Sequence, residues 1–216
     1  MADSRRAFVL RQTHRRDVPG IGGLRLHLTD DVRATWHATQ LETGDPDAPL
    51  PYWSVAWGGG LALARHLRAD PAAVRGRRVV DVGAGSGIVA IAAAQAGATD
   101  VLAIDVDPFA VAAIALNAST NRVRVHAHRA DAFGAGPPDA DVILAADTWY
   151  DPDVARRALD WLRRARAAGS DVLIGDPGRA HLPATALIEL ARYDVRTTSE
   201  LEDLALRQAA VYRLTE

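Results

Sequence analysis

The pattern of apolar and polar positions divides the chain near residue 77. Beyond Arg77, short apolar runs alternate with longer segments whose apolar residues recur at helical spacing. Short apolar runs bounded by turn residues predict buried strands, and the longer segments predict helices. The predicted strands are Val79–Val82, Val101–Ile104, Val123–His128, Asp141–Ala146, Val172–Gly175, Tyr193–Thr198 and Arg207–Leu214. The predicted helices are Ile88–Ala96, Pro108–Ser119, Val154–Ala167 and Ala184–Arg192.

This alternation predicts the architecture of the region. Strand–helix–strand units form parallel sheets whose two faces are covered by helices. The last two predicted strands have no helix between them, so they can pair in antiparallel fashion. The sequence therefore predicts an α/β fold built on a doubly wound seven-stranded sheet, mostly parallel with one antiparallel strand.

The first 50 residues carry a weaker pattern. Turn residues occur at positions 19–20 and 44–46, and only a short strand is expected, near Leu24–Leu28. Residues 55–69 have a mostly apolar face at helical spacing and predict a helix. We therefore expect residues 1–50 to form an irregular N-terminal extension that packs on one domain, residues 51–216.

Charge and composition exclude several classes of protein. The 216-residue chain has a formal net charge of −2, which argues against broad electrostatic capture of nucleic acid. It has no cysteine, so disulfides and thiolate metal sites are excluded. No apolar run approaches the roughly 20 residues that a membrane span needs, and the first residues lack the apolar core of a signal peptide. We expect a cytoplasmic protein whose partners are neither membranes nor nucleic acids.

Arginine supplies all 25 basic residues, and it is dense near the N-terminus. Residues 1–33 contain seven arginines against four aspartates. Such a segment is either a solvated surface or a docking site for an acidic partner, and the sequence leaves both interpretations open.

A glycine-rich loop joins the first strand of the alternating region to its first helix. It reads Val80-Asp81-Val82-Gly83-Ala84-Gly85-Ser86-Gly87. Glycines let a backbone approach a ligand closely, and the carboxyl ends of parallel strands are where such sheets bind ligands. A dinucleotide-binding loop has a third glycine where this chain has Ile88, which disfavours a dehydrogenase. The D-x-G-x-G-x-G pattern instead resembles motif I of class I methyltransferases, whose cofactor is S-adenosylmethionine.

That resemblance implies a Rossmann-like sheet with strand order 3-2-1-4-5-7-6. It also implies that Gly83, Gly85 and Gly87 contact S-adenosylmethionine. Asp81, at the start of the loop, can organise backbone amides and water around the cofactor's ammonium group.

Acidic residues follow the next two predicted strands. Asp105 ends the second strand, where a carboxylate can accept hydrogen bonds from both hydroxyls of a ribose. Asp107 is the alternative, but it is expected to cap the helix that begins at Pro108. Asp131 follows the third strand and resembles the adenine-contacting acidic residue of the same methyltransferases. Each residue alone is ordinary surface or cap, whereas their succession at neighbouring strand ends favours a cofactor site.

The candidate catalytic residues, Asp147 and Tyr150, follow the fourth predicted strand. The chain lacks the prolines of the N/D-P-P-Y/F/W motif found in enzymes that methylate base nitrogens or glutamine amides. Asp147 and Tyr150 resemble the D-x-x-Y form of the seven-β-strand protein lysine methyltransferases. A carboxylate can orient a lysine amine and relay its proton, and Trp149 or Tyr150 can hold a cationic product. The alternative is that Asp147 caps the following helix and the aromatic residues belong to the core.

A wider set of segments resembles one methyltransferase family. The segments are Pro51–Arg65, Ile104–Ala110, Leu116–Ala118, Gly175–Arg179 and Thr197–Asp203. As a set they resemble the family that methylates lysines in the β subunit of electron transfer flavoprotein, and the match runs from about Phe8 to Leu214. The resemblance implies a protein lysine N-methyltransferase with that β subunit as its protein substrate, and it places Trp57 beside the cofactor.

Several alternatives stay open from the sequence. The acceptor can be another protein or a small-molecule amine, and a cofactor-binding subunit without catalysis is a further candidate. Gly58-Gly59-Gly60 indicates close backbone approach, and Asp176–Arg179 is either part of the ligand side or a bare turn. His126 and His128 share one face of a strand, but without a third ligand no metal site is expected.

Overall fold

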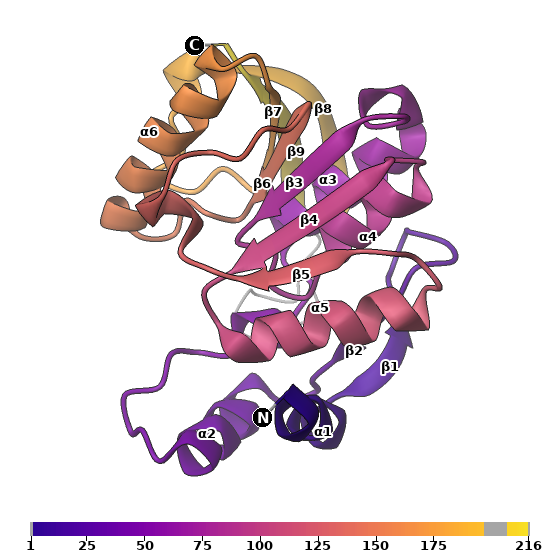
Figure 1. Cartoon of the computed structure of the whole chain (residues 1–216), viewed down its shortest axis with the longest axis vertical. Helices are drawn as coiled ribbons and strands as arrows, with labels where there is room; N and C mark the ends of the chain where they lie inside the picture. Colours follow the sequence, from indigo (N-terminus) through magenta and orange to yellow (C-terminus); the bar gives the residue numbers. More distant parts are fainter. Residues whose placement is uncertain (1, 197–206, 216) are drawn as a thin grey trace.

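The computed structural model describes residues 2–196 and 207–215, and its centre is a seven-stranded sheet (Figure 1). The strand order is β5-β4-β3-β6-β7-β9-β8, which is 3-2-1-4-5-7-6 when β3 is counted first. Strands from β5 to β7 pair in parallel, and β9 pairs antiparallel with both of its neighbours. The predicted α/β, Rossmann-like fold is therefore confirmed. The strands are β3 (Arg78–Val82), β4 (Asp100–Asp105), β5 (His126–Arg129), β6 (Val142–Ala146), β7 (Asp171–Asp176), β8 (Leu187–Val195) and β9 (Arg207–Leu214).

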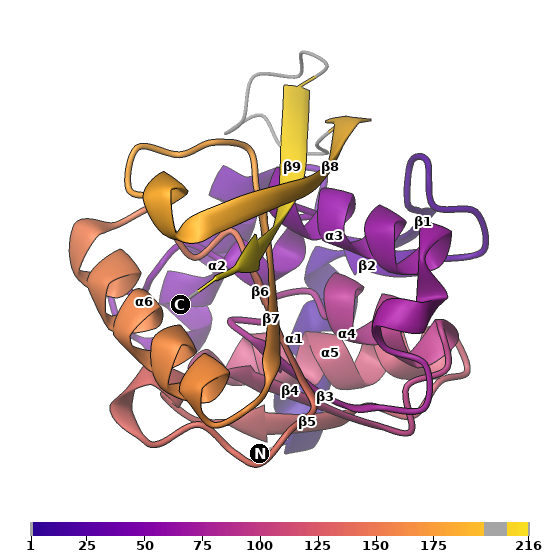
Figure 2. The ribbon, with the colours of Figure 1, turned by 90° about the horizontal axis from the view of Figure 1, so that it is seen from above.

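Helices cover both faces of this sheet. On one face lie α3 (Gly58–Ala69), α4 (Ile88–Gln95) and α5 (Pro108–Thr120), and on the other lies α6 (Pro152–Ala167) (Figure 2). Strand β6 shows why both faces need cover. Its residues Val142 and Leu144 pack into the core under α4, whereas Ile143 and Ala145 pack into the core under α6. Successive side chains of a strand point to opposite faces, so an entirely apolar strand has to be buried on both sides.

The expectation that the first 50 residues are irregular, apart from a short strand, is wrong. They form α1 (Ala2–Gln12), β1 (His14–Asp17), β2 (Arg25–Leu28) and α2 (Val32–Thr43), which lie below α5 in Figure 1. Phe8 of α1 contacts Phe109 of α5, with ring centroids 4.8 Å apart. Helices α1 and α2 are mostly polar, so their tertiary contacts stabilise them more than a periodic apolar face does. The domain boundary at residue 50 stays a prediction.

The predicted helix Ala184–Arg192 is also wrong. The chain makes a single turn of 3₁₀ helix, η4 (Ala184–Ala186), and continues as β8. Alanine, leucine and glutamate favour a helix locally, but pairing along the length of β9 overrides that preference. The predicted strand that starts at Tyr193 is the end of β8. Its last residues, and the segment Thr197–Asp203 quoted for the resemblance, lie outside the described residues.

Candidate active site

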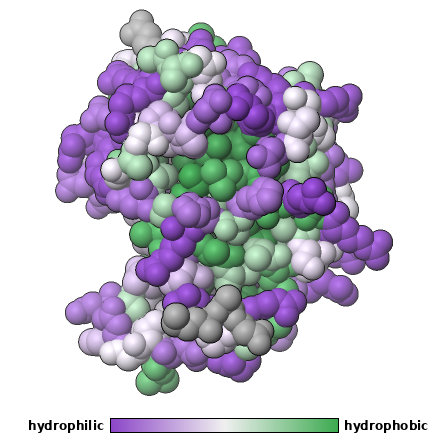
Figure 3. Space-filling view, in the orientation of Figure 1, coloured by the Kyte–Doolittle hydropathy of each residue, from purple (hydrophilic) through white to green (hydrophobic). Residues whose placement is uncertain are grey.

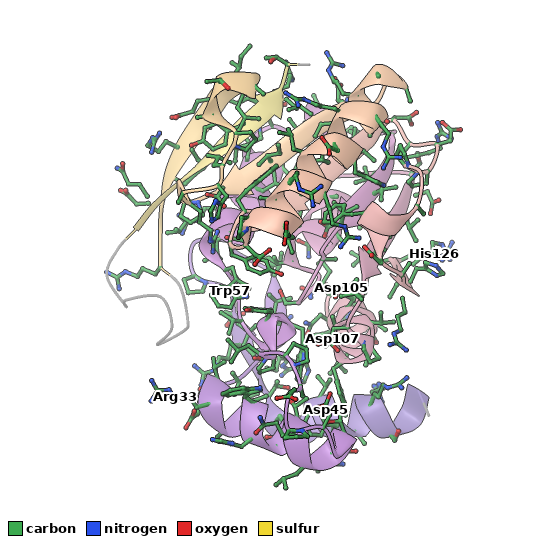
Figure 4. The ribbon with its side chains drawn as sticks, turned by 90° about the vertical axis from the view of Figure 1, so that its left-hand side faces the viewer. Arg33, Asp45, Trp57, Asp105, Asp107 and His126 are labelled. Atoms are coloured by element: carbon green, nitrogen blue, oxygen red, sulfur yellow. The ribbon has the colours of Figure 1, made fainter. Side chains whose placement is uncertain are left out.

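A cavity of about 600 Å³ opens at the carboxyl ends of β3, β4 and β6. Residues 49–57, ahead of α3, line one side of it, and the strand ends and the glycine loop line the other. Figure 4 shows Trp57, Asp105 and Asp107 together in the middle of the molecule, between the sheet above and helices α1 and α2 below. Cavities of this size hold small molecules of cofactor size.

The three glycines of the loop play different parts. All have positive φ angles, 64° at Gly83, 52° at Gly85 and 79° at Gly87. Gly83 and Gly85 line the cavity, as predicted from the loop. Gly87 begins α4 behind the loop, and a Cβ there would lie 3.3 Å from the Cα of Ile114 in α5. Gly87 is not among the residues that line the cavity, and what it provides is close packing of the loop against α5.

Two carboxylates face the cavity from β3 and β4, and of these Asp81 is buried and Asp105 is partly buried. Asp81 is 1% exposed, and its Oδ2 accepts a hydrogen bond of 3.0 Å from the backbone N–H of Ala90 in the first turn of α4. Burial raises the pKa of Asp81 to about 8. Asp105 accepts hydrogen bonds from the backbone N–H of Gly85 at 2.8 Å and of Asp107 at 2.9 Å. Burial raises the pKa of Asp105 as well, so both carboxyls lie where charge is costly unless a cation arrives.

The neighbouring acidic residues are already engaged. Asp107 accepts a hydrogen bond of 2.7 Å from the N–H of Phe109, which confirms it as the cap of α5. Asp131 accepts a hydrogen bond from the N–H of Phe133 and so caps the short helix η3 (Ala132–Gly134). The same carboxylate pairs with Arg157 of α6 at 2.5 Å. Asp131 still lines the cavity, at the end of β5 where the sequence places it.

Asp147 caps a helix, but not the one that follows it. Its Oδ1 accepts from the N–H of Gly59 at 3.0 Å and its Oδ2 from the N–H of Gly60 at 2.7 Å, at the start of α3. The helix that follows, α6, is capped by Asp151, so the alternative of Asp147 as the cap of the following helix is wrong. A Cβ on Gly59 would lie 2.2 Å from the carbonyl oxygen of Gly175, so only glycine brings this helix end so close to the sheet.

Arg179 joins Asp147 to Asp176. From the sequence alone, its segment was either part of the ligand side or a bare turn. Its Nη1 lies 2.5 Å from Oδ1 of Asp147 and 2.9 Å from Oδ2 of Asp176. Asp176 is fully buried, and it accepts 2.7 Å hydrogen bonds from the N–H groups of Gly178 and Arg179. Burial raises the pKa of Asp147, and Arg179 opposes that rise. The segment Asp176–Arg179 is therefore part of the site and not a bare turn.

Aromatic rings line the cavity on the side of Asp147. Tyr150 lines the cavity, and its ring centroid lies 5.4 Å from that of Tyr52 in the short helix η1 (Tyr52–Ser54). Trp57 lies next to Tyr52, with ring centroids 5.8 Å apart, and its Nε1 donates to the carbonyl of Tyr52. Trp149 is completely buried in the core under α6, so of the two aromatic residues proposed to hold a product only Tyr150 reaches the cavity. Tyr52 was not recognised from the sequence.

The two histidines of β5 lie apart from this site. His126 is at the right-hand edge of Figure 4, and its Nε2 is 3.6 Å from Oδ1 of Asp100. Within the described residues, no group of three histidine, aspartate or glutamate side chains is arranged to hold a metal ion.

Comparison with known proteins gives the chain its family. A protein from Xenopus laevis called electron transfer flavoprotein beta subunit lysine methyltransferase is 36% identical over 215 residues, covering 96% of this chain and 85% of that protein. A protein of the same name from Danio rerio is 38% identical over 171 residues, covering 76% of this chain and 66% of that protein. The chain belongs to this methyltransferase family. The resemblance noted in the sequence is thereby confirmed.

Three further matches are also methyltransferases. The family model described as ribosomal protein L11 methyltransferase (PrmA) matches residues 67–146, from the end of α3 through the glycine loop to the end of β6. A putative RNA methyltransferase from Pyrococcus horikoshii superposes with a TM-score of 0.61 at 14% identity, covering 79% of this chain and 90% of that one. The N-methyltransferase NodS from Bradyrhizobium japonicum, solved with S-adenosyl-L-homocysteine, gives 0.54 at 20% identity, covering 71% and 86%. At these identities the likeness concerns the fold.

Among the described residues, no helix combines the length and the apolar character that crossing a bilayer requires.

Proposed function

We propose that the chain is a protein lysine N-methyltransferase that transfers methyl groups from S-adenosylmethionine to lysines of the electron transfer flavoprotein β subunit. One observation carries the proposal. A single cavity joins two carboxylates that accept only backbone N–H groups, on the β3 and β4 side, to aromatic rings and a carboxylate paired with arginine on the β6 and β7 side. The first side suits a cationic nucleoside, and the second suits an amine.

The residues on the β3 and β4 side fit the cofactor. S-adenosylmethionine carries an ammonium group and a ribose diol, which carboxylates bind as hydrogen-bond acceptors. We assign the ammonium to Asp81, the ribose hydroxyls to Asp105 and the adenine to the region of Asp131. The backbone of Gly83 and Gly85 lies against the same ligand, and Trp57 covers it from the other wall of the cavity.

The chemistry requires a nitrogen with a free lone pair. When bound, S-adenosylmethionine supplies an electrophilic methyl group: the nitrogen–carbon bond forms as the carbon–sulfur bond breaks, and the bonding electrons leave with sulfur. A lysine ammonium has a reference pKa near 10.4, so each nitrogen has to release a proton to water before it is methylated. A third methylation gives a cation with no proton left to release.

Asp147 orients that nitrogen in this account. A carboxylate has about four acceptor positions, and Gly59, Gly60 and Arg179 occupy three of those on Asp147. The remaining position on Oδ2 accepts an N–H of the amine. Arg179, which Asp147 shares with Asp176, also offsets part of the charge of Asp147. This matters because a carboxylate without such a partner would favour the protonated amine, which cannot react. We therefore assign Asp147 to positioning and Tyr150 to contact with the amine.

The test uses purified enzyme, the purified β subunit from the same organism and methyl-labelled S-adenosylmethionine. We expect mass gains in steps of one methyl group, localised to lysine by peptide mass spectrometry. The enzyme contains no lysine, so every methyllysine detected has to come from the substrate. A β subunit whose methylated lysines are changed to arginine should stop the gain.

Other acceptors give different results in the same experiment. Label that enters a different protein, or the small-amine fraction of an extract, would replace the β subunit as substrate while leaving methyl transfer intact. Cofactor binding without any transfer would indicate a silent subunit. A cytoplasmic location stays a prediction.

A further inference from the structure

Two exposed tyrosines mark the mouth of the cavity. Tyr52 is 40% exposed and Tyr150 52% exposed, and with Val106 they are the large hydrophobic residues that combine strong exposure with a place on the cavity wall. The other strongly exposed hydrophobic residues among those described, Leu10, Leu41 and Ile188, lie elsewhere. Figure 3 shows hydrophobic side chains gathered across the middle of the molecule, bordered by hydrophilic ones above and below. Exposed aromatic rings grouped at a cavity indicate a surface that a ligand covers.

The spacing of the two rings suits a cation. Their centroids are 5.4 Å apart and the ring planes are inclined by 34°. Cation–π attraction acts within about 6 Å of a ring centroid, so one cation can lie within reach of both rings. The arginines that line the cavity are engaged with carboxylates: Arg157 with Asp131, and Arg179 with Asp147 and Asp176. The cation–π contact found among the described residues is Arg11 over Phe8, and neither of these residues lines the cavity.

The chain supplies the two tyrosines from segments that are distant in sequence. Tyr52 lies in η1, ahead of the glycine-rich start of α3, and Tyr150 follows β6. The η1 helix is anchored from below, because the ring of Trp53 is buried against Phe109 of α5. The position of Tyr52 at the cavity is therefore set by packing that does not involve Tyr150.

We propose that Tyr52 and Tyr150 together bind the cationic nitrogen of the acceptor lysine between rounds of methylation, and that Tyr52 thereby sets how many methyl groups one lysine receives. This inference rests on the proposed lysine methyltransferase function. After each transfer the nitrogen is cationic and carries one N–H fewer, so hydrogen-bond acceptors such as Asp147 hold it less well. Attraction to an aromatic face does not need an N–H, and it therefore retains mono- and dimethyllysine while the spent cofactor is exchanged. The nitrogen then loses its proton to water, takes the next methyl group, and ends as a quaternary cation.

The test compares Tyr52→Leu with Tyr52→Phe, which removes the hydroxyl and keeps the ring. The matched control is Tyr193→Leu, in β8, whose side chain contacts His66 and not the cavity. Purified β subunit is methylated to partial conversion, and peptide mass spectrometry gives the ratio of tri- to monomethyllysine. We expect Tyr52→Leu to lower that ratio about 2- to 30-fold, the range for loss of one cation–π contact. Tyr52→Phe and Tyr193→Leu should keep the parent ratio.

A binding measurement on the unmodified enzyme separates charge from shape. Choline and its uncharged isostere 3,3-dimethylbutan-1-ol are titrated while the tyrosine ring resonances are followed by NMR. We expect choline, and not the alcohol, to shift the ring resonances of Tyr52 and Tyr150. This readout also serves if Tyr52→Leu does not fold.

The two hypotheses fail in different ways. If the parent enzyme methylates lysine and Tyr52→Leu gives the same ratio, or the alcohol shifts the rings as choline does, the role of Tyr52 is wrong and the proposed function stands. If the parent enzyme methylates no lysine at all, the proposed function fails, and the inference fails with it.

Discussion

The two sides of the cavity are assembled from different kinds of contact. On the cofactor side, the bonds of Asp81 and Asp105 reach residues 9 and 20 positions away in the chain. On the acceptor side, Asp147 bonds to residues 88, 87 and 32 positions away. The contacts of the cofactor side therefore form within a short stretch of sequence. Those of the acceptor side form only when the start of α3 and the ends of β6 and β7 come together in the fold.

The two sides also differ in charge. Asp81 and Asp105 accept their hydrogen bonds from backbone N–H groups, and burial raises both pKa values. Asp147 and Asp176 share the guanidinium of Arg179. The first arrangement favours the arrival of a cation, and the second keeps a carboxylate beside an amine without favouring its protonated form.

The largest effect is expected from Asp147→Asn. An amide cannot accept on both sides, so it loses the pairing with Arg179 and the orientation of the amine. We expect turnover on the β subunit to fall about 10²- to 10⁴-fold, the range for residues that act on the proton or position of a reacting group. Initial rates measure it, and calorimetry should show cofactor affinity little changed.

Asp151→Asn is the matched control for that variant, because Asp151 caps α6 and lies outside the cavity lining. Asparagine caps a helix about as well as aspartate does, so this variant should keep both stability and turnover. Parent-rate methylation by Asp147→Asn would show that the acceptor side does not depend on this carboxylate.

The next effect concerns the cofactor side. Asp105→Ala removes the proposed ribose contact and should weaken S-adenosylmethionine binding by about 1.5–3 kcal/mol, the range for a hydrogen bond to a charged group. Asp107→Ala removes only the cap of α5, so it should lower the melting temperature more than the affinity. Calorimetry distinguishes the two residues. The reverse order of affinities, or micromolar binding of NAD, would refute the assignment.

Gly59→Ala tests the contact between α3 and the sheet. The added Cβ would meet the carbonyl oxygen of Gly175, so the backbone has to shift. Overpacking of this kind costs about 1–3 kcal/mol. Gly136→Ala is the control, since a Cβ there has nothing within 4 Å. Urea denaturation should show the loss for position 59 and not for position 136, and equal stabilities would mean that the helix end is not held as described.

The smallest effect is a pH dependence set by Asp81. Its pKa of about 8 keeps the carboxyl mostly protonated at pH 7, and an ammonium ligand favours the ionised form. Binding should therefore release a proton, and affinity should rise with pH up to about 8, by at most about tenfold per unit. Calorimetry in buffers of different ionisation enthalpy measures that proton. Asp81→Asn should remove the proton released by Asp81 and leave only what Asp105 releases. An unchanged proton release would exclude Asp81 from the ammonium site.

The cofactor side was predictable because it is local. The acidic residues there lie in or just after strands that the apolar pattern reveals, and the ends of parallel strands meet at one edge of the sheet. Asp105 and Asp131 line the cavity from the positions that this reasoning gives them. The capping role of Asp107 followed from its place ahead of Pro108.

The acceptor side was predictable only in part, because its partners are set by tertiary structure. No local pattern pairs Tyr52 with Tyr150, or shows that Asp147 caps α3. The prediction of a helix at Ala184–Arg192 was wrong for the same reason. The local preference for a helix is overridden by pairing with β9, which lies further along the chain. Two features of the sequence do point to the acceptor side. They are the run of three glycines at the start of α3 and the G-D-P-G-R sequence at the end of β7.

The most direct test of the division between the two sides is a crystal structure of the protein with S-adenosylhomocysteine. The account predicts ribose hydroxyls within about 3 Å of the Asp105 carboxylate, a hydrogen-bonding distance. It also predicts that the amino group lies at Asp81 and that the sulfur faces the side of Asp147 and Tyr150. A ribose bound to Asp107, or a sulfur turned away from the tyrosines toward Asp131, would contradict it.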